Sequence, residues 1–186
     1  MINSVPKFIR LDKPASATSF GIADSPIGFL LAVWMDHILV HLALLPAGAE
    51  TQIDGILRDL HLAADLPRND TPAKHLVRDT LFPNKTWTGI FTADNTPVTG
   101  FYGTDFQWHA MNRLLRVKPG KTITYRELAK LAGNEKAARA AGSICARNPI
   151  PFIIPCHRIL ASNGGLGGYA FGTGLKRELL RLEQSA

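Results

Sequence analysis

A cysteine followed directly by a histidine and an arginine stands near the end of the chain, at Cys156, His157 and Arg158. An apolar run at 152–154 and a proline precede it. A neighbouring imidazole or guanidinium lowers the pKa of a thiol, and the resulting thiolate is the nucleophile of cysteine chemistry. The pattern therefore predicts a reactive thiol at Cys156. The alternative, a small buried side chain, is the usual state of a free cysteine.

The chain has only one other cysteine, Cys145, among small and apolar residues of a predicted helix. We expect Cys145 to be an ordinary buried side chain. Two cysteines are too few for a disulfide framework or a cysteine-rich zinc site. They favour a reducing, cytoplasmic setting, with the thiol free for chemistry and no bound metal.

Length and composition describe a globular protein of one domain or two small ones. The 186 residues are 46% hydrophobic and 19% charged, which excludes a largely disordered chain. No apolar stretch approaches the ~20 residues of a membrane span, and no secretory signal is visible. We expect no contact with a membrane.

Charge is distributed unequally between the two halves. Residues 1–100 hold 8 Lys and Arg against 10 Asp and Glu, whereas residues 101–186 hold 13 against 5. A basic half joined to a slightly acidic one indicates a polyanionic partner, with DNA or RNA first. The alternative explanation of the basic half is simple solubility.

The first half has the pattern of a small α/β domain, which we place at residues 1–100. We expect a loose arm or an irregular edge at 1–26 and a turn-rich region with short strands at 82–103. Runs rich in Val, Ile, Leu and Trp predict two strands at 28–35 and 37–45. Helical spacing follows at 50–65, and a second helix is expected at 71–81 with Thr71 as its N-cap.

The second half, residues 101–186, has the pattern of a mostly α-helical domain. Thr104 is the expected N-cap of a helix to about Val117. Thr124 and Glu127 form a capping-box pattern before a helix at 125–131, which a glycine ends. A helix at 135–147 follows at once, so the pair predicts a helix-turn-helix. We further expect a buried extended segment at 152–154, a loop at 164–174 and a final helix at 175–183.

The second helix of that pair is rich in alanine and glycine and carries Lys136, Arg139 and Arg147. Small residues give the helix a thin face that can approach another backbone closely. Its basic residues favour a helix that faces DNA, and the alternative is a helix packed tightly within the protein.

These motifs resemble the O6-alkylguanine-DNA alkyltransferases, also called methylated-DNA–protein-cysteine methyltransferases. The resemblance extends over about residues 103–184 and is only weak in the first half. Met111 and Ala110 depart from common family residues at what we expect to be core positions. The motifs that carry it, in chain order, are Gly103-Thr104-Asp105-Phe106-Gln107, Pro119 to Ala129, Lys136-Ala137-Ala138-Arg139-Ala140, Asn148-Pro149, Ile154-Pro155-Cys156-His157-Arg158, Gly168-Tyr169, and Lys176, Leu179, Leu180 and Glu183.

The resemblance implies direct, irreversible transfer of an alkyl group from O6-alkylguanine to Cys156, once per molecule and without a cofactor. His157 would be the base, acting through a water, and Glu183 would orient it. Asn148 would hold the turn that carries the cysteine. Tyr125 and Lys176 would stabilise the charge on the departing guanine. O4-alkylthymine is left open as a further substrate.

The resemblance also implies a double-stranded DNA partner, bound by a monomer with the damaged base rotated out of the stack. Arg139 would fill the vacated place, and the helix that carries it would enter the minor groove. Other expected DNA contacts are Tyr125, Thr124, Arg126 and Asn134. Backbone groups of Cys156, Ile159 and Ala170 would read the guanine edge, with Tyr169 lining the pocket.

Two other classes of function compete with this interpretation. A binding module would recognise alkylated DNA without reacting, but the chain keeps Cys156, His157, Asn148 and Glu183. A thiol hydrolase would use the Cys–His pair, but it leaves the basic helix pair unexplained and lacks the papain-type signature.

Overall fold

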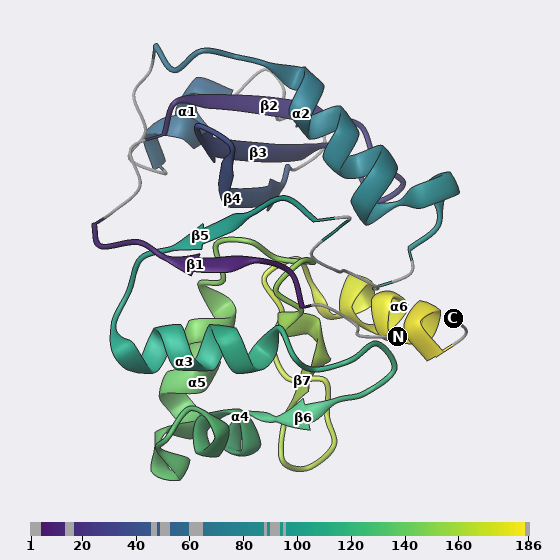
Figure 1. The fold of residues 1–186 in the computed structure, drawn as a ribbon. Coiled ribbons are helices and arrows are strands. Elements are labelled where there is room, and N and C mark those ends of the chain that lie inside the picture. Colours follow the sequence, from purple (N-terminus) through teal and green to yellow (C-terminus); the bar gives the residue numbers. More distant parts are fainter. Residues whose placement is uncertain are drawn as a thin grey trace.

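The structure is a computed structural model that describes residues 5–13, 17–45, 48, 53–59, 65–87, 89, 94 and 96–184. A mixed sheet with two helices beside it forms one part of the molecule, and a group of helices lies below it (Figure 1). The small sheet with helices that was expected in the first half is confirmed.

The sheet has the strand order β1-β5-β4-β3-β2. Its strands are β1 (Phe8–Arg10), β2 (Ser19–Ala23), β3 (Leu30–Met35), β4 (Ile38–Leu44) and β5 (Thr99–Phe101). β2, β3 and β4 are antiparallel neighbours, whereas β5 runs parallel to both β4 and β1. The predicted pair of strands is therefore confirmed as β3 and β4, joined by a turn in which Asp36 has a φ of 54°.

Of the two expectations for residues 1–26, the loose arm is wrong, because β1 and β2 lie there and form the two edges of the sheet. β1 pairs with β5, about ninety residues further along the chain, in the register Phe8 to Thr99. The alternation of apolar and polar residues in β2 is too short to predict a strand, and β2 is stabilised by pairing with β3. Such strands depend on partners that a local pattern does not contain.

The helices of the first half are α1 (Ile53–Asp59) and α2 (Asp70–His75), which continues as a π-helical stretch (Leu76–Leu81) and is followed by a short 3₁₀ turn (Pro83–Lys85). α1 lies within the range expected at 50–65, and residues 50–52 and 60–64 lie outside the described part. The expected N-cap at Thr71 is wrong: the side chain of Asn69 accepts a hydrogen bond from the Thr71 N–H. Asn is also a preferred N-cap, so the helix begins earlier.

The second half contains α3 (Asp105–Leu114), α4 (Tyr125–Leu131), a 3₁₀ turn (Glu135–Ala137), α5 (Ala138–Ala146), a 3₁₀ turn (Cys156–Arg158) and α6 (Thr173–Gln184). A two-stranded parallel sheet joins β6 (Ile123–Thr124) to β7 (Ile159–Leu160). Both predicted caps, Thr104 and Thr124, are confirmed, each with a complete capping box. α6 begins two residues before the predicted start.

The segment at 152–154 is buried as expected, but it is a turn and not a strand. Phe152 has a φ of 71°, and the Ile154 N–H donates to the Ile150 carbonyl. The prolines on both sides restrict the backbone, and this tight turn directs the chain into the 3₁₀ turn at Cys156.

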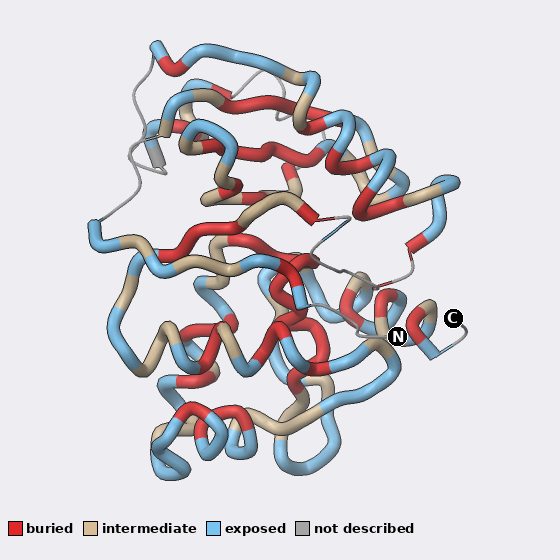
Figure 2. The backbone as a smooth tube through the Cα atoms, viewed as in Figure 1, coloured by how far each residue is buried: buried red, intermediate tan, exposed pale blue. Residues whose placement is uncertain are grey.

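The two faces of the sheet belong to different hydrophobic clusters. One face packs against α1 through Leu31 and Val33. The other face, with Leu39 and Leu42, belongs to a cluster that continues through α3, α4 and α5 to Cys156. Figure 2 shows this buried backbone running from the sheet into the helices below it. The predicted domain boundary at 100/101 falls inside β5, and the division into two domains stays a prediction.

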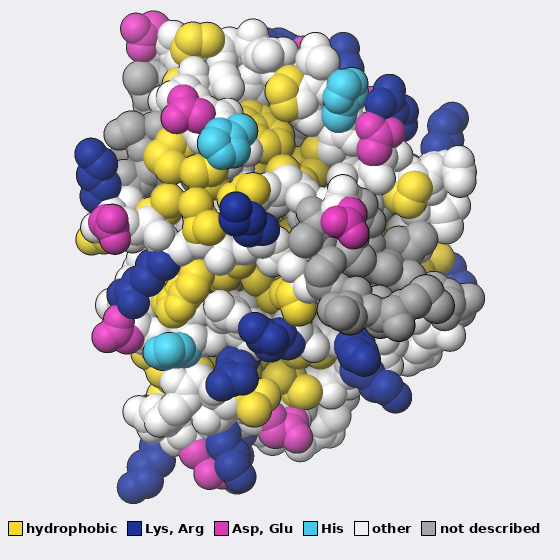
Figure 3. Space-filling model, in the orientation of Figure 1, with side chains coloured by type: hydrophobic (Ala, Val, Ile, Leu, Met, Phe, Trp, Pro, Cys, Tyr) yellow, Lys and Arg dark blue, Asp and Glu magenta, His cyan; other side chains and the backbone are white. Residues whose placement is uncertain are grey.

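Within the described residues, none of the helices is long and apolar enough to cross a membrane. Lys and Arg side chains are spread over the lower part of the molecule, where Figure 1 places α3 and α4 (Figure 3).

Candidate active site

Cys156 opens a 3₁₀ turn in the buried part of the second half. The residue is only 5% exposed. The amide of Asn148 donates one hydrogen bond to the Ile154 carbonyl at 2.7 Å and another to Cys156 Sγ at 3.1 Å. Its side-chain oxygen accepts from the Ile150 N–H at 3.1 Å. Asn148 therefore ties both ends of the buried turn together and touches the thiol itself, which supports its expected role.

A pocket of about 380 Å³ opens at the thiol. Its wall comes from four parts of the chain: the start of α4, one side of α5, the 3₁₀ turn and the glycine-rich loop before α6. The lining residues are Tyr125, Gly142, Cys145, Ala146, Cys156, Gly168, Tyr169 and Ala170. The pocket therefore brings together three of the residues expected from the sequence, Tyr125, Tyr169 and Ala170, around the predicted nucleophile.

Two glycines lie close to the Tyr125 side chain, which lines the pocket. A Cβ atom added at Gly142 would lie 3.9 Å from the Tyr125 ring, in ordinary contact. At Gly167, which has a φ of 65°, an added Cβ would approach the Tyr125 hydroxyl to 3.2 Å. The glycine-rich loop thus lets the backbone come close to Tyr125, as a side chain there would not.

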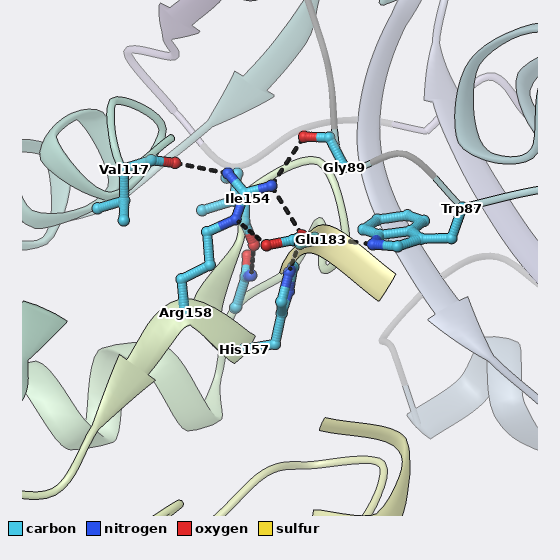
Figure 4. Close-up of polar contacts among 8 residues, drawn as sticks. Trp87, Gly89, Val117, Ile154, His157, Arg158 and Glu183 are labelled. Atoms are coloured by element: carbon cyan, nitrogen blue, oxygen red, sulfur yellow. Dashed lines mark hydrogen bonds and ion pairs between the residues drawn. The ribbon is translucent and has the colours of Figure 1, made fainter. Parts of the chain in front are cut away.

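The two residues after the cysteine belong to a buried polar cluster centred on Glu183 (Figure 4). His157 Nε2 lies 2.7 Å from Glu183 Oε1. The Arg158 guanidinium donates to both carboxylate oxygens, from Nε to Oε2 at 2.9 Å and from Nη2 to Oε1 at 2.8 Å. The remaining Arg158 donors reach the carbonyls of Val117 and Gly89. The cluster therefore joins α6, the 3₁₀ turn, the end of the α3 region and the first half of the chain.

The charges of this cluster follow from burial and pairing. Although burial opposes ionisation, hydrogen bonds from His157 and Arg158 lower the pKa of Glu183 to about 2. Burial lowers the pKa of His157, and the adjacent Glu183 offsets only part of that effect. Glu183 is therefore an ionised acceptor and His157 a neutral ring. The His157 proton must lie on Nε2, since an ionised carboxylate can only accept.

The expectation that His157 and Arg158 lower the pKa of the thiol is wrong. Burial raises the pKa of Cys156, and the hydrogen bond from Asn148 and the charge of Lys176 offset it only in part. The basic neighbours do not reverse this because both point at Glu183. Cys156 is therefore a neutral thiol in the resting protein and needs a base for its chemistry.

Two buried polar atoms beside the pocket have no hydrogen-bond partner within the described part of the chain. They are His157 Nδ1 and the hydroxyl of Tyr169. A neutral imidazole whose Nε2 donates to a carboxylate offers a lone pair at Nδ1. Buried polar atoms are normally paired. Their state here fits a site that a substrate completes.

Lys176 is fully buried but does not line the pocket. Its ammonium donates to the carbonyls of Ile159 and Leu166, each at 2.5 Å. This arrangement holds the start of the glycine-rich loop against β7. Ile159 is likewise absent from the pocket wall, and its carbonyl already accepts from Lys176. Lys176 and Ile159 therefore do not line the pocket, although both were expected to act on the guanine base.

The residues expected to contact DNA lie on or beside α4 and α5. Arg126, Asn134 and Arg139 are exposed. The side chains of Thr124 and Asn134 accept backbone hydrogen bonds as N-caps, whereas Arg126 and Arg139 reach solvent. These contacts to DNA stay predictions. Among the described residues, no cluster of three or more His, Cys, Asp or Glu could hold a metal ion.

Sequence reasoning missed four contributors to this site. The sequence predicts no role for Arg158 beyond its place next to Cys156. It predicts an ordinary buried side chain at Cys145, and the structure adds that Cys145 lines the pocket. Trp87 donates from its indole nitrogen to Glu183 Oε1 at 3.3 Å, and Gly89 accepts from Arg158. No local signal marks Trp87 or Gly89, because they lie 96 and 69 positions from their partners.

The fold and the site together define a small mixed α/β protein with a pocketed thiol backed by a buried Glu–His–Arg cluster. The family model for "6-O-methylguanine DNA methyltransferase, DNA binding domain" matches residues 105–185. The chain belongs to the family of the O6-alkylguanine-DNA alkyltransferases, the methylated-DNA–protein-cysteine methyltransferases.

Similar proteins support this assignment over different lengths. A methylated-DNA–protein-cysteine methyltransferase of Methanosarcina acetivorans is 51% identical over 83 residues, which are 45% of this chain and 53% of that protein. The chain thus spans about half the length of the curated relatives it matches first. The crystal structure of Mycobacterium tuberculosis O6-methylguanine methyltransferase is 32% identical, with a TM-score of 0.68, and the match covers 90% of this chain and 93% of that one. A structure of the same bacterium's OGT in complex with DNA matches at 31% identity, a TM-score of 0.68 and the same coverage.

Proposed function

We propose that this chain repairs DNA by transferring an alkyl group from O6-alkylguanine to Cys156, once per molecule and without a cofactor. The observation that carries the proposal is that Cys156 lines a pocket of about 380 Å³ and is followed in the chain by His157, which pairs with Glu183. The family membership and the DNA complex of a similar protein support the same conclusion.

The transfer begins with removal of the thiol proton. Glu183 holds the His157 proton at Nε2, which leaves Nδ1 as the basic nitrogen. We infer that Nδ1 takes the Cys156 proton through a bridging water, and that ionised Glu183 stabilises the imidazolium. The Asn148 amide, 3.1 Å from Sγ, favours the thiolate as it forms.

The thiolate then attacks the alkyl carbon on guanine O6. An S–C bond forms, the C–O6 bond breaks, and the bonding electrons remain on the base. Donors near the base stabilise this charge. Our candidate for this role is Tyr125, which lines the pocket, and we infer that Lys176 acts indirectly by holding the loop. The thioether is stable, so Cys156 is not regenerated.

The base reaches the pocket only outside the duplex. We propose that α4 and α5 form a helix-turn-helix in the domain 101–186, and that α5 enters the minor groove with Arg139 in the place of the rotated base. Flipping requires a few kcal/mol and is easier for a poorly paired base. In this proposal the protein acts as a monomer, and Arg126, Thr124, Tyr125 and Asn134 lie along the DNA.

Intact-mass spectrometry tests the proposed transfer. After mixing with a duplex oligonucleotide that contains O6-methylguanine, the protein should gain the mass of one methyl group. Trypsin separates the two thiols, since cleavage after Arg139, Arg147 and Arg158 places Cys145 and Cys156 on different peptides. The methyl group should be found on peptide 148–158. No gain with substrate in excess would exclude the proposed transfer.

Replacing Arg139 by alanine should separate base flipping from chemistry. The rate of repair in duplex DNA should fall by roughly tenfold or more, because the vacated stack is no longer filled, which corresponds to ~1.4 kcal/mol or more. Reaction with free O6-benzylguanine should change little. Arg177→Ala, at an exposed arginine of α6, is the matched control and should leave both rates unchanged. Equal losses on both substrates would show that Arg139 does not fill the stack.

A further inference from the structure

The Glu183 cluster is completed by a segment that lies outside the second half of the chain. Trp87 is 3% exposed, and its indole N–H donates to Glu183 Oε1 at 3.3 Å. Two residues later, the Gly89 carbonyl accepts from Arg158 Nη2 at 2.7 Å. Figure 4 shows Trp87 and Gly89 on one side of Glu183, with the Arg158 side chain on the other.

The Trp87 ring also packs directly against the residues that carry the chemistry. Its centroid lies 5.8 Å from that of His157, edge to face at 71°, and 6.0 Å from that of Phe152. Phe152 belongs to the tight turn that leads into Cys156. Trp87 therefore contacts Glu183, which orients the proposed base, and His157, which is that base. It also contacts Phe152, in the turn that precedes Cys156.

Close approach at Gly89 shows how tightly this segment is fitted. The residue has a φ of 64°, and an added Cβ would lie 2.5 Å from Glu183 Oε1 and 2.8 Å from Arg158 Nη2. Only a residue without a side chain lets the backbone reach these charged groups. Trp87 and Gly89 are therefore in close contact with the charged groups of the site.

We propose that Trp87 is a positioning residue for the Glu183–His157 pair, and that its indole N–H fixes the carboxylate oxygen that orients the base. This inference rests on the proposed function for its consequence in catalysis. Glu183 Oε1 lies within hydrogen-bonding distance of donors from His157, Arg158 and Trp87, so the indole is one of three donors that fix this oxygen. Without it, Oε1 loses one of its three donors, and only His157 and Arg158 orient the carboxylate that positions the base.

Trp87→Phe removes the N–H and keeps a ring, and Trp34→Phe is the matched control. Trp34 is also buried, at 6% exposed, but its indole nitrogen has no hydrogen-bond partner within the described residues. We expect Trp87→Phe to slow single-turnover transfer by about tenfold, as for loss of a hydrogen bond to a charged group. Trp34→Phe should leave the rate unchanged. DNA affinity should not change in either variant.

The pH profile separates positioning from packing. His157 faces Glu183 and Lys176 of α6, Arg158 of its own turn, and the titratable Cys156 and Tyr169. Loss of the indole donor leaves more negative charge on Glu183 to stabilise the imidazolium. The fall of the transfer rate in acid should therefore begin at a higher pH in Trp87→Phe than in the wild type, and Trp34→Phe should show no such shift. A slower reaction whose rate falls in acid at the same pH as in the wild type would mean that Trp87 only packs against the site, and it would overturn the proposal.

An NMR measurement on the wild-type protein decides the matter independently of transfer. The chain has three tryptophans, so three indole N–H signals are expected, and Trp34→Phe and Trp108→Phe assign the Trp87 signal by elimination. The Trp87 signal should shift as His157 titrates, and the Trp34 signal should not. A stationary Trp87 signal overturns the positioning role. Failure of wild-type methylation would instead contradict the proposed function, and the NMR result would still stand.

Discussion

Replacement of Cys156 by alanine is expected to abolish alkyl transfer completely while the protein still binds alkylated duplex DNA. The sulfur is the only reacting atom that the variant lacks, and truncation at a pocket wall enlarges the pocket without closing it. Intact-mass spectrometry with O6-methylguanine duplex should show no methyl gain at any substrate excess, and a gel-shift titration should show retained binding.

Cys145→Ala is the matched control, because Cys145 lines the same pocket. Burial raises the pKa of Cys145 to about 12, so its thiol stays protonated and does not compete as a nucleophile. The control should accept one methyl group at the wild-type rate. A methyl group on tryptic peptide 140–147 in place of 148–158 would assign the reaction to the wrong sulfur and contradict the proposed mechanism.

Glu183→Gln is expected to have the largest effect on stability. It removes the carboxylate that pairs with the Arg158 guanidinium, which is 3% exposed, and leaves that buried charge without a counter-ion among the described residues. Breaking a buried pair in this way typically lowers the free energy of unfolding by about 3–5 kcal/mol. Urea unfolding at pH 7 should show this loss. Transfer should also slow by roughly a hundredfold or more, since His157 loses the group that orients and charges it.

Glu178→Gln is the matched control on the same helix. Glu178 pairs with Arg181, and both side chains are at least half exposed, so their interaction is screened by solvent. The control should unfold and react like the wild type. Equal destabilisation by both changes would mean that α6 is sensitive to any loss of charge and that the buried cluster has no special role.

The gap in stability between wild type and Glu183→Gln should depend on pH in a fixed direction. The folded-state pKa of Glu183 is about 2, below the ordinary value of 4.5. A depressed carboxyl pKa stabilises the folded state above the unfolded value, and this stability is lost as pH falls toward the folded value. The gap should therefore be full at pH 7 and shrink progressively below about pH 4.5. A gap that widened in acid would contradict the assigned charge state.

Local patterns predicted the elements whose determinants lie within a few residues. The capping boxes at Thr104 and Thr124 marked the starts of α3 and α4, because side chain and backbone partner are three positions apart. The β3–β4 pair was also predictable, as a turn joins neighbouring strands. β1 and β2 were missed, since β1 depends on β5 across the chain and β2 shows little alternation of its own.

The sequence by itself determined which residue types were available for chemistry: a Cys–His–Arg run, an asparagine eight positions before the thiol, and a glutamate on the last helix. Tertiary structure alone decided that Arg158 turns to Glu183, that Cys156 rests as a neutral thiol, and that Trp87 completes the cluster. The reason is that charge states and hydrogen bonds in a buried site depend on desolvation and on partners far apart in the chain, and neither is contained in local spacing.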